Sequence, residues 1–209
     1  MPRGSTPKAR AKKVKLLLLD VDGVMTDGSI WLFPAPAGAQ QSTASQAAER
    51  ADAGGFAISS ASMIEAKGFN AHDGTAISLA RLGGLKTGVI TKRISETVAL
   101  RARDLRLDHV YQGAADKTQA FEEILRKEGL QEEQAAYVGD DIIDLPVMRR
   151  CGLAMAVASA RDEVKRAAHF VTPHRGGDGA VRDAVEFILR AQGKWRRVVE
   201  EYLGERRKG

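Results

Sequence analysis

The sequence predicts an α/β fold built on a doubly wound parallel sheet. Short apolar segments suited to buried strands alternate with longer amphipathic segments suited to helices, which is the order that crossover helices impose. The clearest strand is Leu16–Leu19, four leucines in a row, because a strand buried on both faces needs no polar alternation. With 209 residues, the chain suits one domain with a full core.

The remaining elements follow in order along the chain. Helix starts are suggested by Ser95 with Glu96 and by Pro146. The strands are expected at 14–20, 86–91, 108–112, 135–139, 152–157 and 169–172. The helices are expected at 74–83, 95–106, 117–129, 141–150, 160–167 and 178–192, with an extension of the last to 203 as an alternative. The segment Gly28–Phe33 should begin a β-hairpin that returns through Ile64–Phe69.

The ends of the chain differ in charge from its middle. Residues 1–15 hold six basic and no acidic side chains, and residues 190–209 hold seven basic and three acidic. The formal net charge of +5 therefore hides a middle of about −5. We expect residues 1–13 to form a flexible basic tail, 14–193 the folded domain and 194–209 a basic C-terminal tail. Because the basic excess is confined to the two terminal segments, we expect no surface for nucleic-acid binding.

A segment of unusual composition interrupts the hairpin. Residues 34–62 are rich in Ala, Ser and Gln and include Pro34, Pro36, Gly54 and Gly55. They lack the periodicity and length of a separate cap domain, so we expect a low-complexity insertion at the hairpin tip. A short helix at 43–51 is an alternative, because Gln, Ala, Glu and Arg favour helix.

The chain's location is expected to be the cytoplasm. No apolar run approaches the roughly 20 residues of a membrane span, and the basic N-terminus is followed by only a short apolar strand, unlike a signal peptide. Cys151 is the only cysteine, which excludes an internal disulfide, and its apolar surroundings suggest a buried thiol rather than a nucleophile.

Two carboxylates directly follow the leucine strand. Asp20 and Asp22 lie at the carboxyl end of that strand, where open α/β sheets bind ligands. Residues two apart in an extended segment point to the same side, and two close anions repel unless a cation or a proton separates them. The pair suits a Mg²⁺-dependent reaction with one nucleophile and one acid/base, although a helix cap and a turn residue would produce the same pattern.

Three later segments favour the catalytic interpretation. Thr91 ends an apolar strand and precedes Lys92 and Arg93, so its hydroxyl could bind a phosphoryl oxygen or cap a helix. Lys117 begins a helix, where the dipole disfavours a cation unless an anion faces it; a solvated surface lysine is the alternative. Asp140, Asp141 and Asp144 follow a third apolar strand, and carboxylate oxygens are the ligands that Mg²⁺ prefers.

Taken in order, these motifs resemble the haloacid dehalogenase superfamily of phosphatases. Five blocks narrow the resemblance to its 3-deoxy-D-manno-octulosonate 8-phosphate (KDO 8-phosphate) phosphatase family, over about residues 14–193. They are DVDGVMTDG at 20–28, FNAHDG at 69–74, YQG at 111–113, YVGDDIIDLPVM at 137–148 and GGDGAVR at 176–182. The resemblance implies a Rossmann-like core with a hairpin flap and no large cap domain.

The resemblance also implies a role for each matching residue. Asp20 would be the nucleophile that forms an aspartyl phosphate, and Asp22 the acid/base. Thr91 and Lys117 would bind the transferring oxygens. Mg²⁺ would be held by the carboxylates of Asp20 and Asp140 and by the backbone carbonyl of Asp22. The further expected site residues are Gly23, Lys92 and Arg93 in substrate binding, and Asp141 and Asp144 as residues that orient Lys117 and the metal's water ligands.

The resemblance leaves the sugar and the assembly as expectations. Family members commonly carry Gly where this chain has Lys92, and many carry a cation at His72 or at Ser78. Lys92, Arg93 or His72 could bind the sugar carboxylate instead. The expected partners are a small sugar phosphate and three further copies of the chain in a homotetramer. The alternatives are a sialic-acid-type 9-phosphate as substrate, phosphoryl transfer by a mutase, and a non-catalytic interaction domain.

Overall fold

The computed structural model describes residues 5–35, 56–57 and 63–204. Its centre is a six-stranded sheet with the order β10-β9-β8-β1-β5-β7, in which all paired strands are parallel. The predicted fold class is confirmed. The strands are β1 Leu16–Leu19, β5 Lys86–Ile90, β7 His109–Tyr111, β8 Ala135–Gly139, β9 Leu153–Ala156 and β10 Phe170–Val171.

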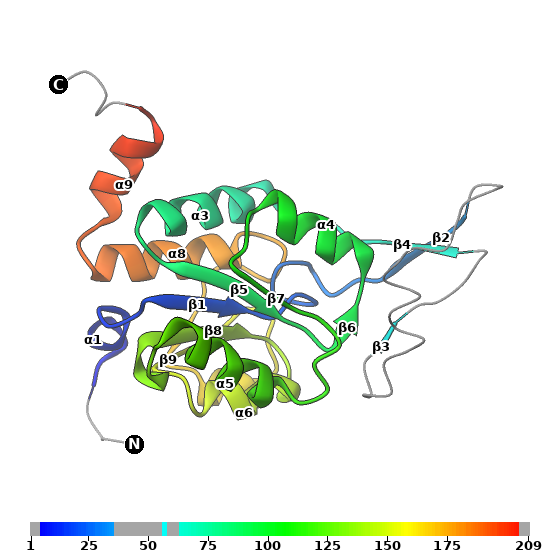
Figure 1. Cartoon of the computed structure of the whole chain (residues 1–209), viewed down its shortest axis with the longest axis horizontal. Helices are drawn as coiled ribbons and strands as arrows, with labels where there is room; N and C mark the ends of the chain where they lie inside the picture. The colour runs from blue at the N-terminus through cyan, green and yellow to red at the C-terminus, as the bar shows by residue number, and fades with distance from the viewer. Residues whose placement is uncertain (1–4, 36–55, 58–62, 205–209) are drawn as a thin grey trace.

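Helices cover both faces of this sheet (Figure 1). Helices α3, α4 and α8 lie on one face, and α5, α6 and α7 on the other. The helices are α1 Pro7–Ala11, α3 Ala71–Leu82, α4 Glu96–Asp104, α5 Lys117–Glu128, α6 Leu145–Met148, α7 Asp162–Ala167, α8 Ala180–Ala191 and α9 Trp195–Tyr202. Short 3₁₀ turns, η1 Glu132–Gln134 and η2 Ile142–Asp144, flank β8.

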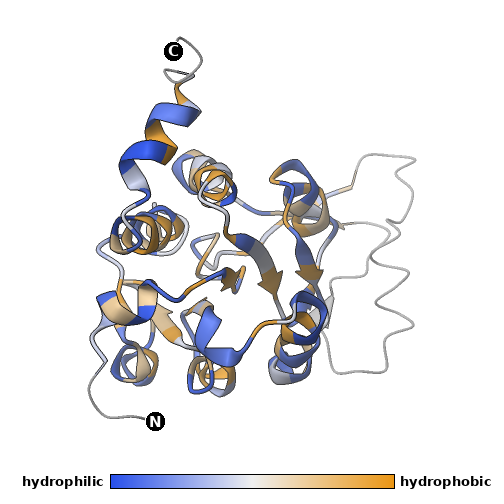
Figure 2. Ribbon diagram, turned by 60° about the vertical axis from the view of Figure 1, so that its left-hand side comes forward, coloured by the Kyte–Doolittle hydropathy of each residue, from blue (hydrophilic) through white to orange (hydrophobic). Residues whose placement is uncertain are grey.

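The leucine strand β1 forms the middle of the core. All four of its side chains are fully buried, because β5 and β8 flank it and helices cover both faces. In Figure 2 the central strands are mostly orange, whereas the helices carry both hydrophobic and hydrophilic residues. This burial holds the chain rigidly up to Leu19, so the residues that follow begin from a fixed position.

A small antiparallel hairpin projects from the end of the molecule toward which β1 and β5 point (Figure 1). It pairs β2 Trp31–Pro34 with β4 Met63–Ala66. The segment between them lies mostly outside the described residues, including the short helix expected at 43–51. Its described part, β3 Phe56–Ala57, pairs in parallel with β6 Arg93–Ile94, next to the end of β5.

Each terminal segment contains a docked helix, although residues 1–13 were expected to form a flexible basic tail and 194–209 a basic C-terminal tail. Helix α1 lies within residues 1–13: Thr6 caps it, Ala11 is buried, and Arg10 donates to the carbonyl of Gly152 at 2.8 Å. Helix α9 lies within residues 194–209 and buries Val198. Charge counting predicts neither helix, although α9 falls within the alternative extension to 203, because a few apolar side chains suffice to dock a short amphipathic helix.

Two predicted helices also need correction. The helix expected at 178–192 ends at Ala191 and does not run on to 203, because Gly193 turns the chain with a positive φ of 68° before α9 begins. The helix expected at 141–150 is a 3₁₀ turn followed by the short α6. Pro146 in the first turn of α6 lacks the N–H that a continuous helix from residue 141 would use.

Candidate active site

The predicted site residues meet at the carboxyl ends of three neighbouring strands. Asp20 follows β1, Thr91 follows β5 and Asp140 follows β8. The register pairs Leu19 with both Val89 and Val138, so these three strands end side by side. Together with parts of the adjoining loops they line a pocket of about 290 Å³. Its lining residues are Asp20, Asp22, Thr91, Lys92, Arg93, Asp140, Asp141 and Ile143.

Asp20 is a buried carboxylate with a cation against it. It is only 4% exposed, and its Oδ1 lies 2.9 Å from Nζ of Lys117 and accepts from the backbone N–H of Val21 at 2.7 Å. Burial, followed by the charge of Asp144, raises the pKa of Asp20 to about 7, although Lys117 acts in the opposite direction. A further positive charge beside Asp20 would therefore stabilise its ionised form.

Lys117 joins the helix α5 to this cluster. It is the first residue of α5, after the cap Asp116, and its side chain is 3% exposed. Nζ lies 2.7 Å from Oδ1 of Asp144 in addition to its contact with Asp20. Burial lowers the pKa of Lys117, but the charges of Asp20 and Asp144 outweigh it and the net shift is upward. The lysine thus faces anions at a helix start, as the dipole argument required.

Asp144 organises the loop after β8 by hydrogen bonding. Its Oδ1 accepts from Lys117 and from the hydroxyl of Tyr137 at 2.8 Å, and its Oδ2 accepts from the backbone N–H of Asp140 at 2.9 Å and of Asp141 at 3.2 Å. Both oxygens are therefore already engaged. The side chain of Asp141 instead accepts from the N–H of Ile142 and lines the pocket, and no described contact joins it to Lys117.

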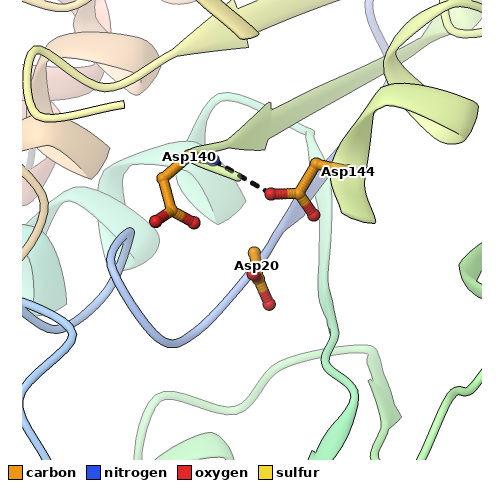
Figure 3. A group of neighbouring side chains, drawn as sticks. All are labelled: Asp20, Asp140 and Asp144. Atoms are coloured by element: carbon orange, nitrogen blue, oxygen red, sulfur yellow. Dashed lines mark hydrogen bonds between the residues drawn. The ribbon is translucent and has the colours of Figure 1, made fainter. Parts of the chain in front are cut away.

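Three carboxylates form a cluster that fits a cation. Oxygens of Asp20, Asp140 and Asp144 lie within 4.8 Å of one another, and Figure 3 shows the three side chains gathered at the strand ends. Oδ1 of Asp140 is buried and has no hydrogen-bond partner among the described residues. Burial and then the charges of Asp20 and Asp144 raise the pKa of Asp140 to about 8. A hard divalent cation would satisfy this orphaned oxygen.

Two glycines allow close approaches around the site. Gly23 has a φ of +88°, and a Cβ there would overlap Oδ2 of Asp140. A Cβ on Gly176 would overlap the carbonyl of Gly23, so the GGDG segment approaches the loop after β1. Asp178 precedes α8 but does not cap it, because the N-cap is Gly179, which makes no side-chain bond.

Thr91 and its neighbours form the opposite wall. Thr91 is 2% exposed, and its hydroxyl accepts weakly from the N–H of Arg93 at 3.4 Å. Ser95, rather than Thr91, is the N-cap of α4. Lys92 and Arg93 line the pocket, whereas His72 lies exposed in the first turn of α3 and is not part of the pocket lining.

Sequence reasoning missed two charged residues beside Asp22. Lys67 follows β4, its side chain is fully buried, and its Nζ donates to Oδ1 of Asp22. Glu65 in β4 lies 3.2 Å from the same Nζ. No motif marks them, because Asp22, the partner of Lys67, is 45 positions away in sequence and only the return of the hairpin brings Lys67 to it. Tyr137, quoted only as a part of a block, was likewise given no role.

Comparison with known proteins points to one family. Residues 90–183 match the family described as haloacid dehalogenase-like hydrolase. The chain is 38% identical over 185 residues to the 3-deoxy-D-manno-octulosonate 8-phosphate phosphatase KdsC of Yersinia pestis, an alignment that covers 88% of this chain and 84% of that protein.

Two similar solved structures carry divalent metals. The 3-deoxy-D-manno-octulosonate 8-phosphate phosphatase of Moraxella catarrhalis, in complex with magnesium, phosphate and KDO, has a TM-score of 0.77 and 28% identity, covering 94% of this chain and 97% of that one. The cobalt-bound phosphatase of Haemophilus influenzae has a TM-score of 0.71 and 30% identity, covering 89% and 93%. This chain therefore belongs to the 3-deoxy-D-manno-octulosonate 8-phosphate phosphatase family of haloacid dehalogenase-like hydrolases.

Proposed function

We propose that this enzyme hydrolyses KDO 8-phosphate to KDO and inorganic phosphate, with Mg²⁺ as cofactor, in the synthesis of a lipopolysaccharide precursor. One observation carries the chemistry: the buried carboxylate of Asp20 contacts Lys117, lies within 4.8 Å of a carboxylate oxygen of Asp140, and lines the same pocket as Asp22. The sugar is supported by the family to which the chain belongs.

In the first step an oxygen of Asp20 attacks phosphorus, and the bond from phosphorus to the sugar oxygen breaks. Asp22 gives its proton to that sugar oxygen, so that a neutral alcohol leaves. In the second step water attacks the aspartyl phosphate, and Asp22 takes its proton. Phosphate then leaves, and the Asp20 carboxylate and the protonated Asp22 are regenerated.

Lys117 and Thr91 stabilise the charge that moves onto the phosphoryl oxygens. Lys117 is held in place by Asp144 and Tyr137, so little reorganisation is needed when the charge develops. Arg93 and Lys92 line the pocket on the wall next to Thr91, and their positive charges would attract the substrate's anionic oxygens.

The donor set of the site fits Mg²⁺. The carboxylates of Asp20 and Asp140 and the backbone carbonyl of Asp22 would hold the ion, because Asp144 already uses both of its oxygens. When bound, the ion supplies positive charge that draws the phosphate onto Asp20 and offsets the repulsion between the acids.

The test is a substrate screen with the variant Asp20→Asn. The wild-type enzyme should show its highest kcat/KM for KDO 8-phosphate against sialic-type 9-phosphates and hexose phosphates, and EDTA should abolish turnover. Asp20→Asn should keep the fold by circular dichroism and lose activity. Substantial activity in that variant would contradict the covalent mechanism. A preference of the wild-type enzyme for a 9-phosphate would instead favour the alternative substrate, a sialic-acid-type 9-phosphate.

We also propose that the chain assembles as a homotetramer in the cytoplasm. Strand β2 exposes apolar side chains, with Trp31 57% and Phe33 47% exposed, and Ile64 of β4 adds to them. A two-stranded hairpin is marginal by itself, and a second copy of the same hairpin would cover its apolar faces. The free buried thiol of Cys151 suits a reducing compartment. No described helix is long and apolar enough to cross a membrane.

A further inference from the structure

A buried lysine lies behind the pocket without taking part in the mechanism above. The side chain of Lys67 is fully buried, and Lys67 is not among the residues that line the pocket. An ammonium group removed from water is costly unless charged partners satisfy it. Its partners are the carboxylates of Asp22 and Glu65.

Glu65 is itself fixed, so the lysine has a rigid support. The side chain of Glu65 is 11% exposed, and its Oε1 accepts from the hydroxyl of Ser95 at 2.8 Å. The backbone carbonyl of Glu65 accepts from the hydroxyl of Thr97 at 3.3 Å. A chain of contacts therefore runs from the start of α4 through Glu65 and Lys67 to Asp22.

The two oxygens of Asp22 have different surroundings. Oδ1 accepts from the buried Lys67, whereas Oδ2 lies 3.3 Å from Nε of Arg93, which lines the pocket. The bond to Lys67 fixes the plane of the carboxylate and turns Oδ2 toward the pocket. Oδ2 is then the oxygen that exchanges protons with substrate and water.

We propose that Lys67, supported by Glu65, is the positioning residue for the acid/base Asp22. The inference rests on the proposed function, because it takes Asp22 as the group that protonates the leaving oxygen. Lys67 touches no reacting atom in this scheme. It holds Asp22 in the orientation from which the proton reaches the sugar oxygen as the bond to phosphorus breaks.

If Lys67 has this role, the activity lost when Lys67 is replaced should depend on the leaving group of the substrate. A sugar alkoxide is a poor leaving group and needs the proton, whereas p-nitrophenolate is a stable anion near neutral pH and leaves without one. kcat/KM reports the steps up to the departure of the first product, which is the step where the proton is given. A merely structural loss would lower kcat/KM for both substrates alike.

The experiment compares Lys67→Met with wild type on KDO 8-phosphate and on p-nitrophenyl phosphate. Since a general acid contributes at least about 100-fold, we expect kcat/KM to fall by about 100-fold for the sugar phosphate and by less than about 5-fold for the aryl phosphate. Lys86→Met is the matched control, because Lys86 pairs with Asp108 at the opposite end of β5 from Thr91. In this variant kcat/KM for both substrates should stay near the wild-type values.

A second variant guards against misfolding. Lys67→Met alone leaves Glu65 buried without its cation, so we pair it with Lys67→Met/Glu65→Gln, which removes both charges of the support together. The double variant should show the same selective loss. Glu65→Gln alone, with Lys67 still bonded to Asp22, should lose less on the sugar phosphate than Lys67→Met.

Asp22→Asn separates failure of this inference from failure of the proposed function. If Asp22→Asn loses activity selectively on the sugar phosphate but both Lys67 variants lose equally on the two substrates, or lose nothing, Lys67 does not position Asp22. If Asp22→Asn itself shows no selectivity, the acid role of Asp22 fails and the inference fails with it. The nucleophilic role of Asp20 is judged separately by Asp20→Asn.

Discussion

Asp144 shows how one side chain sets the geometry of several others. It accepts from Lys117, from Tyr137 and from two backbone N–H groups, so it holds the lysine and the loop after β8 at once. Charge-assisted hydrogen bonds of this kind are stronger than neutral ones, and each buried group would be costly to leave unpaired. The surroundings of Asp20 are therefore fixed by contacts within the chain itself.

We expect that position 23 must be glycine for two reasons: its positive φ, and the space that the side chain of Asp140 occupies. Gly23→Ala introduces about 1–2 kcal/mol of strain at a φ of +88° and places a methyl group on Oδ2 of Asp140. We expect the affinity for Mg²⁺, measured by calorimetry, to fall at least about 10-fold, which is about 1.4 kcal/mol. Gly28→Ala is the matched control, with a φ of +86° and its nearest atoms at 3.6 Å. Equal metal affinities in the two variants would contradict this explanation.

The affinity for Mg²⁺ should rise with pH. In the metal-free protein the pKa of Asp20 is about 7 and that of Asp140 about 8, and the ion can bind only when both carboxyls have lost their protons. We expect the affinity to increase between pH 6 and about pH 8 and then level off, with proton release detected by calorimetry in buffers of different ionisation enthalpy. An affinity that does not vary over this range would count against the assignment of these two ligands.

The same pKa shifts fix the sign of a stability effect. A carboxyl whose pKa is raised on folding binds its proton more tightly in the folded state. Proton binding by this carboxyl therefore stabilises the folded state. This stabilisation is fully present below the ordinary pKa of 3.8 and is lost as pH rises through about 7 to 8. Metal-free protein should therefore melt at lower temperature as pH increases over this window, and saturating Mg²⁺ should reduce that slope.

At the scale of elements, helices α3 and α8 are joined by a cap that crosses between them. The N-cap of α8 is Gly179, which offers no side chain. Asp73 in α3 replaces it, because its Oδ1 accepts from the N–H of Arg182 in the first turn of α8 at 2.8 Å. Asp178 is adjacent to this N-cap in sequence, but it remains exposed.

Removing this cap should destabilise the fold. Asp73→Ala leaves the first turn of α8 without its acceptor, and we expect a loss of about 1–2 kcal/mol in the free energy of unfolding. Asp178→Ala should change it by less than about 0.5 kcal/mol, since that side chain makes no described hydrogen bond. Urea denaturation of both variants measures the difference. A larger effect at Asp178 would return the capping role to the local residue.

At the scale of the whole molecule, the hairpin beside the pocket is apolar. Five exposed hydrophobic side chains lie on or next to the hairpin: Ile30, Trp31, Leu32, Phe33 and Ile64. They contrast with a core in which the leucines of β1 are fully buried. Apolar surface gathered on one projecting element is typical of an interface between chains.

The assembly should therefore depend on β2. Multi-angle light scattering should give about four times the 22.5 kDa chain mass for the wild type, and Trp31→Glu with Phe33→Glu should reduce it, because a charge on each residue disfavours burial at a hairpin contact. Leu203→Glu is the control, since Leu203 is 62% exposed in the segment after α9. A fully active monomer of the wild type would show that the chain closes its own site.

Local patterns in the sequence predict the parallel sheet and the order of the site residues along the chain. Strand periodicity and motif spacing are local properties, and the rule that ligands bind beyond the strand ends converts them into one site containing Asp20, Thr91 and Asp140. Lys117 followed in the same way, because a cation at a helix start needs an anion. The roles of these residues remain predictions, and the experiments above test them.

The distant residues that support the site are found only from the packing of the chain. Lys67 reaches Asp22 through the return of a hairpin, and Asp73 caps a helix that begins more than a hundred residues later. Helix α1 docks near Gly152, although its composition alone resembles a solvated tail. The physical reason is common to all three. Burial and hydrogen bonding depend on what packing brings within a few ångströms, and sequence spacing carries that information only for neighbours within one element.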